Sequence, residues 1–436
     1  MTEATTIPAS DDSHAVLPQA ARHTAHPDAQ WFPEAGLGLF IHWGISSVHG
    51  GIDLSWGMIK NKPWDPMGRE ITPEEYYQLA ERFDPQQYDP DKWLRAAKAA
   101  GFRYAVLTTK HHDGYALWPS EYATTGVKQY LGGRDLVQPF VDACRKNGLR
   151  IGFYFSPRDW HYPGFLMPFP DFDRARQGEV PIPDPEQNQR DFEPFYEYTK
   201  GQVEELLTRY GKIDILWFDG IGWPGVTDIH NEDMFALIHR LQPGIVVNNR
   251  WHNMGGERTG DFETPECRLP NERPQGWWEA VDVWPFGNWG YSTSHEYYKS
   301  LGWMLSRLAV CRGWGGNLMV NVGPRPTGEL PDACYRRFEE LAAWMQHSGE
   351  AIFGVQPGPY PRQSNVPVTV RGNRWYLHYA SGFDKQITLR EVAAPRSVTL
   401  LRTGEGLPVE RGRDCVQIIV PSEVRTCDVD VVAVDW

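Results

Sequence analysis

The sequence predicts a (β/α)8-like TIM barrel followed by a small antiparallel β-sandwich. Three observations support this prediction. Short apolar segments alternate with helical segments through most of the 436 residues, and this order is typical of a parallel sheet. The number of such units favours a closed barrel over an open sheet. Beyond Pro357 the helical period ends, and short alternating segments separated by turns follow, which is typical of a β-sandwich.

Three parts are expected along the chain. Residues 1–30 are polar and Ala-rich and are predicted to form a flexible lead-in, residues 31–352 the barrel and residues 353–436 the sandwich. The lead-in shows no apolar core of a secretory signal, and no run of 18 apolar residues occurs anywhere, so a cytoplasmic location is the default. A secreted or periplasmic location would fit if a leader had been removed.

The barrel segments are assigned from apolar pattern, capping residues and glycine stops. A Thr-x-x-Glu capping box, for example, opens a helix at Thr72. Between 251 and 290 the sequence is acidic, aromatic and irregular, so fewer than eight units are clear and closure is an inference. Barrel strands are expected at 37–41, 104–109, 149–155, 213–219, 245–249 and 317–322, and helices at 72–83, 89–100, 135–146, 195–209, 231–241, 296–309 and 331–346. Sandwich strands are expected at 366–370, 375–379, 387–389, 397–401, 416–420 and 429–434.

Composition narrows the class of partner. The formal charge of -13, without a Lys/Arg cluster, argues against nucleic acid, and neutral substrates fit better. The 19 tryptophans permit a sugar-binding cleft, because sugar C–H faces stack on aromatic rings. The six cysteines are scattered singly, which indicates neither a zinc ribbon nor a disulfide scaffold. No cofactor, nucleic acid or membrane is therefore expected as a partner, and no oligomeric state is indicated.

Asp219 ends the central predicted strand and precedes Gly220. In a β/α barrel this end of a strand carries the chemistry, whereas a carboxylate buried there for packing alone would be costly. An isolated Asp-Gly after a strand is more often a helix N-cap. The other strand ends reverse that weighting, because nearly every strand offers a polar residue there. The set is His42, His111, His112, Asp113, Asp159, Asp219, Arg250, Asp261, Glu263 and Glu266.

His111 and His112 suggest metal ligands, but adjacent residues of an extended chain point to opposite faces. No metal site is therefore predicted, and the imidazoles are expected to hydrogen-bond hydroxyl groups. Lys110 is expected to form a salt bridge within the barrel, and Asp113 to orient a histidine.

Several carboxylates, neutral histidines, an arginine and many tryptophans suit glycoside hydrolysis. In that reaction one carboxylate attacks the anomeric carbon and a second protonates the leaving oxygen. Glu266 is the preferred acid, because Thr264 and Pro265 give it a rigid loop base. Glu263 and Glu279 are the alternatives.

Several motifs together resemble the α-L-fucosidases of glycoside hydrolase family 29, over about residues 31–350. They are Phe40-Ile41-His42-Trp43-Gly44, Lys110-His111-His112-Asp113-Gly114, Trp217-Phe218-Asp219-Gly220, Asn249-Arg250, Trp278-Glu279 and Gly316-Asn317-Leu318-Met319-Val320-Asn321-Val322-Gly323-Pro324. The later β-domain also fits this family.

The resemblance implies a retaining enzyme that hydrolyses terminal α-L-fucose of a fucosylated oligosaccharide or glycoconjugate through a covalent fucosyl-enzyme. Asp219 would be the nucleophile and Glu266, in the Thr-Pro-Glu segment, the general acid/base. The residues implied in sugar binding are His42, Trp56, His111, His112, Tyr154 and Arg250. The segment from Ser156 to Asp159 resembles the branch selective for α-1,3/1,4-linked fucose.

Three alternatives remain open. A non-catalytic sugar-binding protein could use the same fold. A different barrel glycosidase, β-galactosidase-like or inverting, is second, and a metal-dependent hydrolase using His111 and His112 is third. Among glycosidases, a carboxylate separation of about 5 to 5.5 Å would indicate retention and about 6.5 to 9.5 Å inversion.

Overall fold

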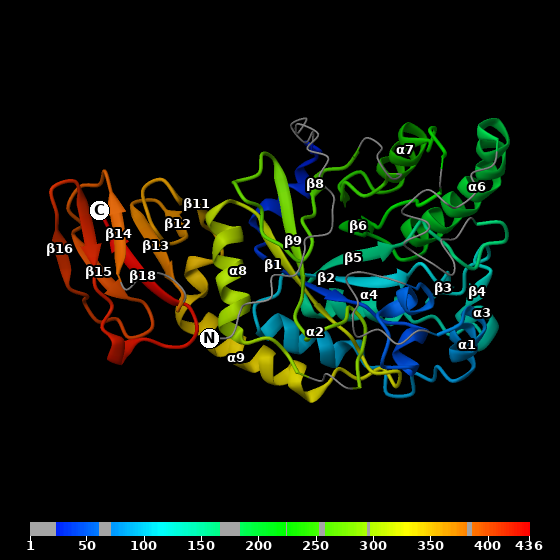
Figure 1. The fold of residues 1–436 in the computed structure, drawn as a ribbon, viewed down its shortest axis with the longest axis horizontal. Coiled ribbons are helices and arrows are strands. Elements are labelled where there is room, and N and C mark those ends of the chain that lie inside the picture. Colours follow the sequence, from blue (N-terminus) through cyan, green and yellow to red (C-terminus); the bar gives the residue numbers. More distant parts are fainter. Residues whose placement is uncertain are drawn as a thin grey trace.

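The computed structural model describes residues 23–60, 71–165, 184–223, 225–252, 258–293, 297–381 and 386–436. An eight-stranded parallel sheet forms a barrel, and antiparallel sheets form a separate lobe at one end of the molecule (Figure 1). The predicted fold class is confirmed.

The barrel strands follow a single order around the sheet. This order is β7 (Val246–Val247), β6 (Ile215–Phe218), β5 (Arg150–Phe155), β2 (Tyr104–Lys110), β1 (Leu37–Ile41), β10 (Asn317–Val322), β9 (Trp277–Val283) and β8 (Phe262–Glu263). A parallel bridge between Asn248 and Phe262 joins the two ends of the sheet. The N–H of Asp261 donates to the carbonyl of Val247 at 2.7 Å across this junction. The barrel therefore closes.

Helices fill most of the crossovers. They are α1 (Pro73–Tyr77), α2 (Pro90–Ala99), α3 (Val127–Tyr130), α4 (Val137–Asn147), α6 (Pro185–Arg209), α7 (Asn231–Leu241), α8 (Leu301–Gly313) and α9 (Asp332–Ser348), with a short ribbon of β3 (Tyr115–Ala116) and β4 (Thr125–Gly126) after β2. The capping box at Thr72 forms as predicted. By contrast, α6 begins at Pro185 and not at 195, because the Asp184 carboxylate caps it. Similarly, α8 begins only at Leu301, where the Ser300 hydroxyl is the cap.

Strand β9 lies in the stretch that the sequence presents as irregular. All seven of its residues are buried. Glu279 and Asp282 interrupt its apolar pattern, but both carboxylates have partners inside the protein. Among the described residues no helix lies between β7 and β9. The missing helices explain why fewer than eight units were apparent.

Alternation along the strands separates two cores. Inward-facing residues fill the barrel, among them Phe40, Tyr154 and Trp217. Outward-facing neighbours such as Leu39, Phe153 and Phe218 pack under the helices. Each inward series continues beyond the strand end, so the barrel mouth receives the residues two positions later, which include His42 and Asp219.

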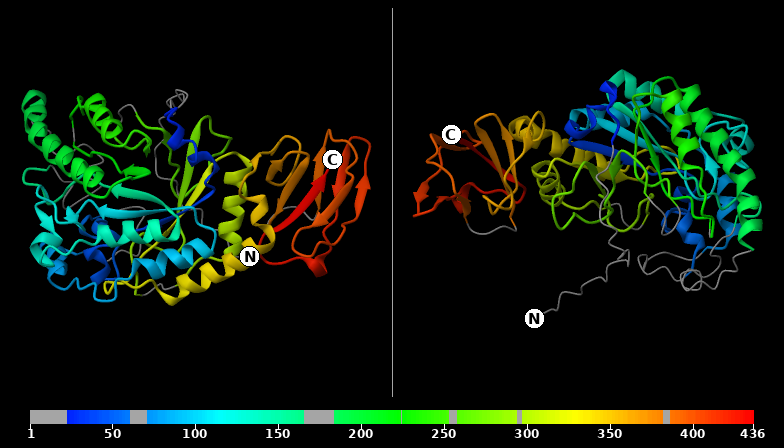
Figure 2. Two further views of the ribbon diagram at one scale, coloured as in Figure 1. Left: turned by 180° about the vertical axis from the view of Figure 1, so that it is seen from behind. Right: turned by 90° about the horizontal axis from the view of Figure 1, so that it is seen from above.

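The C-terminal lobe consists of two sheets. One contains β11 (Gln356–Pro357), β12 (Val368–Arg371), β13 (Arg374–Tyr379), β18 (Asp430–Asp435) and β15 (Ser397–Leu400), and the other β14 (Ile387–Arg390), β17 (Cys415–Ile418) and β16 (Val409–Arg411). Figures 1 and 2 show α8 and α9 between this lobe and the barrel strands. The indole N–H of Trp344 on α9 donates to the carbonyl of Val429 at 2.8 Å, which fixes the lobe to the barrel.

Part of the predicted lead-in, residues 23–30, is described and contacts the barrel. The N–H of Thr24 donates to Asp261 Oδ1 at 2.7 Å, and the His23 ring stacks on Trp277 at 4.1 Å. Residues 23–30 thus pack on the barrel, and the remainder of the predicted lead-in lies outside the described residues. All six cysteines are free thiols. No described helix is both long and apolar enough to span a bilayer.

Candidate active site

Asp219 lies at the barrel mouth directly after β6, where its side chain retains 26% exposure. Its Oδ1 accepts a hydrogen bond from Arg250 Nη1 at 3.0 Å, and its Oδ2 from the Tyr154 hydroxyl at 2.8 Å. Burial acts to raise the pKa of Asp219. The charges of Arg250 and Arg158 and the Tyr154 hydrogen bond outweigh it, so the pKa is lowered. The carboxylate is therefore ionised at neutral pH.

Glu266 reaches the same place from the loop after β8. Arg250 Nη1, which contacts Asp219, also donates to Glu266 Oε2 at 2.7 Å. Because one nitrogen lies 3.0 Å from one oxygen and 2.7 Å from the other, the two oxygens are at most 5.7 Å apart. Arg250 is itself held by Thr264, whose hydroxyl and carbonyl oxygens accept from Nε at 2.7 Å and Nη2 at 2.9 Å.

Three buried histidines line the other side of the mouth. Burial lowers the pKa of His42 to about 4 and that of His111 to about 3, and it also lowers the pKa of His112. All three are neutral at pH 7. The Nδ1 atoms lie 2.7 Å from Asn321 Oδ1 in His42, 2.7 Å from Ser55 Oγ in His111 and 2.6 Å from Ser156 Oγ in His112.

The hydrogen-bond network indicates which ring nitrogens carry protons. The Ser156 hydroxyl donates to the carbonyl of Arg158, so it accepts from His112 Nδ1–H. Asn321 Oδ1 likewise accepts from His42 Nδ1–H. The Nε2 lone pairs of His42 and His112 are thereby left as acceptors for ligand hydroxyls.

The expectation that His111 and His112 point to opposite faces is wrong. Their ring centroids are 4.2 Å apart, because β2 ends at Lys110 and the chain turns at these residues. Among the described residues, His111, His112 and Asp219 are the one group whose ligand atoms, all within 4.8 Å of one another, could surround an ion. Both Asp219 oxygens already accept from Arg250 and Tyr154, and the arginine charge repels a cation. This donor set suits neutral hydroxyl groups better, and the absence of a metal stays a prediction.

Aromatic side chains form the walls. Trp56 stands edge-on to His112 at 5.2 Å. Trp217 lies beneath the Arg250 guanidinium at 4.5 Å and stacks with Tyr154 at 5.7 Å. All eight predicted site residues are therefore brought to one barrel mouth, although their roles remain predictions.

Several other residues expected at the mouth lie elsewhere. Asp113 accepts from the Tyr76 hydroxyl at 2.6 Å and does not orient a histidine. Asp159 is fully buried in an ion pair with Lys110 at 3.0 Å, which confirms the prediction for Lys110. Asp261 precedes β8 and is thus at the opposite end of the barrel.

The two alternative acids do not contact Asp219. Glu279 is fully buried inside the barrel, where it accepts hydrogen bonds from Tyr104 and Trp217. Glu263 is half-buried on β8, next to the inward-facing Phe262, so its side chain points out of the barrel.

Sequence reasoning missed two residues of the mouth. The Trp289 ring lies 5.2 Å from the His42 ring, and the backbone N–H of Trp289 donates to Asp53 Oδ1 at 2.9 Å. Arg158 lies beside Trp56, with its guanidinium carbon 5.7 Å from that ring. Arg158 could have been predicted as a residue of the mouth, because it lies three positions after the end of β5. No comparable signal marked Trp289, because β9 had not been assigned.

A family model described as α-L-fucosidase matches residues 4–350. This chain belongs to the α-L-fucosidase family. Tissue α-L-fucosidase of Bos taurus is 29% identical over 357 residues, which cover 78% of this chain and 72% of that relative. The family resemblance of the motifs is thus confirmed.

Solved structures of α-L-fucosidases share the fold. Isoenzyme 1 from Paenibacillus thiaminolyticus has a TM-score of 0.77 at 29% identity and covers 94% of this chain and 98% of its own. A family 29 α-L-fucosidase from Bacteroides thetaiotaomicron has a TM-score of 0.76 at 26% identity, covering 95% and 97%. That structure is a trapped covalent intermediate with 2-fluoro-fucosyl fluoride, obtained with a glutamate-to-glutamine mutant.

Proposed function

We propose that this protein is a retaining exo-α-L-fucosidase that removes terminal α-L-fucose from glycans or glycoconjugates. The observation that carries the proposal is the Arg250 bridge, which holds Asp219 Oδ1 and Glu266 Oε2 at most 5.7 Å apart. This spacing fits retention, for which about 5 to 5.5 Å is usual, and not inversion at about 6.5 to 9.5 Å. The covalent intermediate of the Bacteroides relative supports the same class.

The reaction has two steps. In the first, Asp219 forms a bond to the anomeric carbon while the bond to the leaving oxygen breaks, and Glu266 gives that oxygen its proton. In the second, Glu266 takes a proton from water, the water oxygen attacks the anomeric carbon, and the ester bond to Asp219 breaks. Two inversions at one carbon give net retention.

The neutral histidines bind the sugar hydroxyls. Because His42 and His112 donate their Nδ1–H groups to Asn321 and Ser156, their Nε2 atoms accept hydrogen bonds from hydroxyl groups. Trp56 and Trp289 supply apolar faces for the ring and the methyl group of fucose. Linkage selectivity and a cytoplasmic location remain predictions of the sequence.

The test compares Asp219→Gly, Glu266→Ala and the control Glu263→Ala on an aryl α-L-fucoside with and without azide. We expect kcat to fall about 10³-fold or more in Asp219→Gly, because no covalent intermediate forms. Azide then attacks the substrate directly and gives β-L-fucosyl azide. In Glu266→Ala, azide intercepts the fucosyl-enzyme and gives the α-azide, whereas Glu263→Ala stays near wild type.

Other results would favour the alternatives. Tight binding of fucose with no turnover of any fucoside would indicate a sugar-binding protein. Activity abolished by a chelator and restored by a divalent metal would indicate a metal-dependent hydrolase at His111 and His112. If Glu263→Ala lost as much activity as Glu266→Ala, the assignment of Glu266 as the general acid/base would no longer hold.

A further inference from the structure

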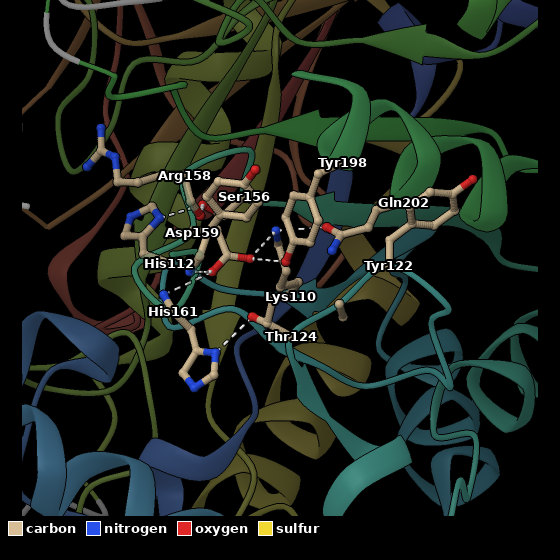
Figure 3. Close-up of polar contacts among 12 residues, drawn as sticks. Lys110, His112, Tyr122, Thr124, Ser156, Arg158, Asp159, His161, Tyr198 and Gln202 are labelled. Atoms are coloured by element: carbon tan, nitrogen blue, oxygen red, sulfur yellow. Dashed lines mark hydrogen bonds and ion pairs between the residues drawn. The ribbon is translucent and has the colours of Figure 1, made fainter. Parts of the chain in front are cut away.

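The loop after β5, residues 156–165, is anchored through Asp159, whose contacts with Lys110 and Tyr198 are drawn in Figure 3. Asp159 Oδ2 accepts hydrogen bonds from Lys110 Nζ at 3.0 Å and from the Tyr198 hydroxyl at 2.7 Å. The Lys110 and Asp159 side chains are 0% exposed. The Ser156 hydroxyl donates to the carbonyl of Arg158 at 2.7 Å. The backbone on both sides of Arg158 is thus held in place.

The Arg158 side chain points away from the Lys110–Asp159 pair (Figure 3). Its guanidinium lies against the loop that follows Asp219, and its Nη2 is 3.3 Å from the position a Cβ would take at Gly220. A Cβ at Gly222 would overlap the guanidinium. These two glycines therefore leave space in which a cation lies beside the nucleophile.

Arg158 differs from Arg250 in its partners. Within the described part of the chain, Arg158 forms no ion pair with a carboxylate, and its buried Nε–H has no acceptor. Arg250 Nη1 contacts Asp219 at 3.0 Å and Glu266 at 2.7 Å. Arg250 therefore contacts both carboxylates and does not by itself distinguish Asp219 from Glu266.

A retaining glycosidase needs this distinction, because one carboxylate must be ionised and the other protonated when substrate binds. Arg158 follows β5, the neighbour of β6 on one side, and lies against Gly220 directly after Asp219, whereas Glu266 follows β8, beyond β7 on the other side. The cation on Arg158 thus acts mainly on Asp219.

The remaining groups that face Asp219 do not replace this charge. The Tyr154 hydroxyl from β5 is neutral, and so are the three histidines that follow β1 and β2. Among the described residues, the charge of Arg250 and then that of Arg158 contribute most to lowering the pKa of Asp219, and His111 contributes less. Glu266, the other carboxyl group at the mouth, contributes no positive charge.

We infer that Arg158 is a positioning residue that acts through its charge on Asp219. It stabilises the ionised form of Asp219 in preference to that of Glu266, so that Asp219 is the nucleophile and Glu266 the acid. This inference rests on the proposed function. It also explains why the buried Nε–H of Arg158 is retained, although a buried donor without an acceptor lowers the stability of the fold.

The experiment measures how fast 2-fluoro-fucosyl fluoride labels Asp219 at different pH values. Fluoride leaves with little help from an acid, so the acidic limb of this profile reports ionisation of the nucleophile. In R158Q and R158M the midpoint of the acidic limb of the labelling rate is expected to rise by about one pH unit. R158K, which keeps the charge, should follow the wild type, as should the control R95Q on the exposed face of α2.

Thermal unfolding identifies variants that have not folded, and R158A replaces R158Q and R158M if neither folds. Slower labelling at every pH with an unmoved acidic limb would overturn the inference, because Arg158 would then be a substrate contact. A limb that moves as far in R158K as in R158Q would overturn it as well. Failure of the wild type to be labelled at Asp219, judged from the mass of its peptide, would overturn the proposed function and this inference with it.

Discussion

At the scale of single residues, Glu279 couples the barrel interior to the active site. It is fully buried on β9 and accepts hydrogen bonds from the Tyr104 hydroxyl and from Trp217 Nε1. Trp217 in turn lies beneath the Arg250 guanidinium. Burial raises the pKa of Glu279 to about 7. Glu279 thus supports the floor of the site without reaching the substrate.

The raised pKa of Glu279 determines the direction in which pH changes the stability of the protein. The pKa of Glu279 rises from 4.5, its ordinary value, to about 7 on folding, so the folded state binds more protons between these values. Stability from this group is therefore retained at low pH and lost as pH rises to about 7, by about 3 kcal/mol.

We expect Glu279→Gln to remove this loss, because glutamine resembles the protonated acid and stays neutral. Urea unfolding at about pH 5 and about pH 8 measures the effect. The free energy of unfolding of the variant relative to wild type should rise by about 3 kcal/mol between the two pH values. The same difference at both pH values would contradict the assigned shift.

At this scale the sequence predicted which side chains gather at the barrel mouth, but not the residues that support them. Asp219, Arg250 and the histidines follow apolar runs, so their place at the strand ends was apparent from the sequence. Trp289 and Glu279 depend on β9, whose acidic residues hide its pattern. The contact between His111 and His112 depends on where β2 ends, because the chain turns directly after Lys110.

At the scale of elements, a close approach between β1 and β2 supports Glu279. Gly38 on β1 pairs with Tyr104 on β2, and a Cβ at Gly38 would overlap the Tyr104 ring. The Tyr104 hydroxyl that binds Glu279 reaches the barrel centre through this space. A glycine is therefore required here for room.

We expect Gly38→Ala to destabilise the protein by about 1 to 3 kcal/mol, because the strand or the ring must move. Gly349→Ala is the matched control, since its Cβ would meet Met345 atoms at ordinary contact distances of 3.5 to 3.7 Å. Chemical denaturation measures both. Equal stability of Gly38→Ala and wild type would show that β1 adjusts without cost.

Elements with a local signal were predicted well, and those fixed by tertiary contacts were not. Capping residues and glycine stops placed α2, α4 and α7 within two residues of their expected ends. Strand β8 was not predicted, because its two residues are too short for a periodic pattern. The strand expected at 245–249 is present as β7, but it has only two residues. The positions of β7 and β8 are fixed by pairing with the neighbouring strands of the barrel.

At the scale of the whole molecule, closure of the barrel assembles the site. Asp219 and Glu266 belong to different strands, and the junction between β7 and β8 brings Arg250 between them. None of the described site residues comes from the C-terminal lobe. That lobe covers α8 and α9, where Trp314 Nε1 donates to the carbonyl of Tyr360 at 3.1 Å.

The stereochemistry of hydrolysis tests the central claim most directly. Proton NMR of an aryl α-L-fucoside mixed with the enzyme records which anomer of fucose appears before mutarotation. The pair of carboxylates held by Arg250 predicts α-L-fucose as the first product, because two successive inversions retain the configuration. First release of β-L-fucose would contradict the covalent mechanism at Asp219.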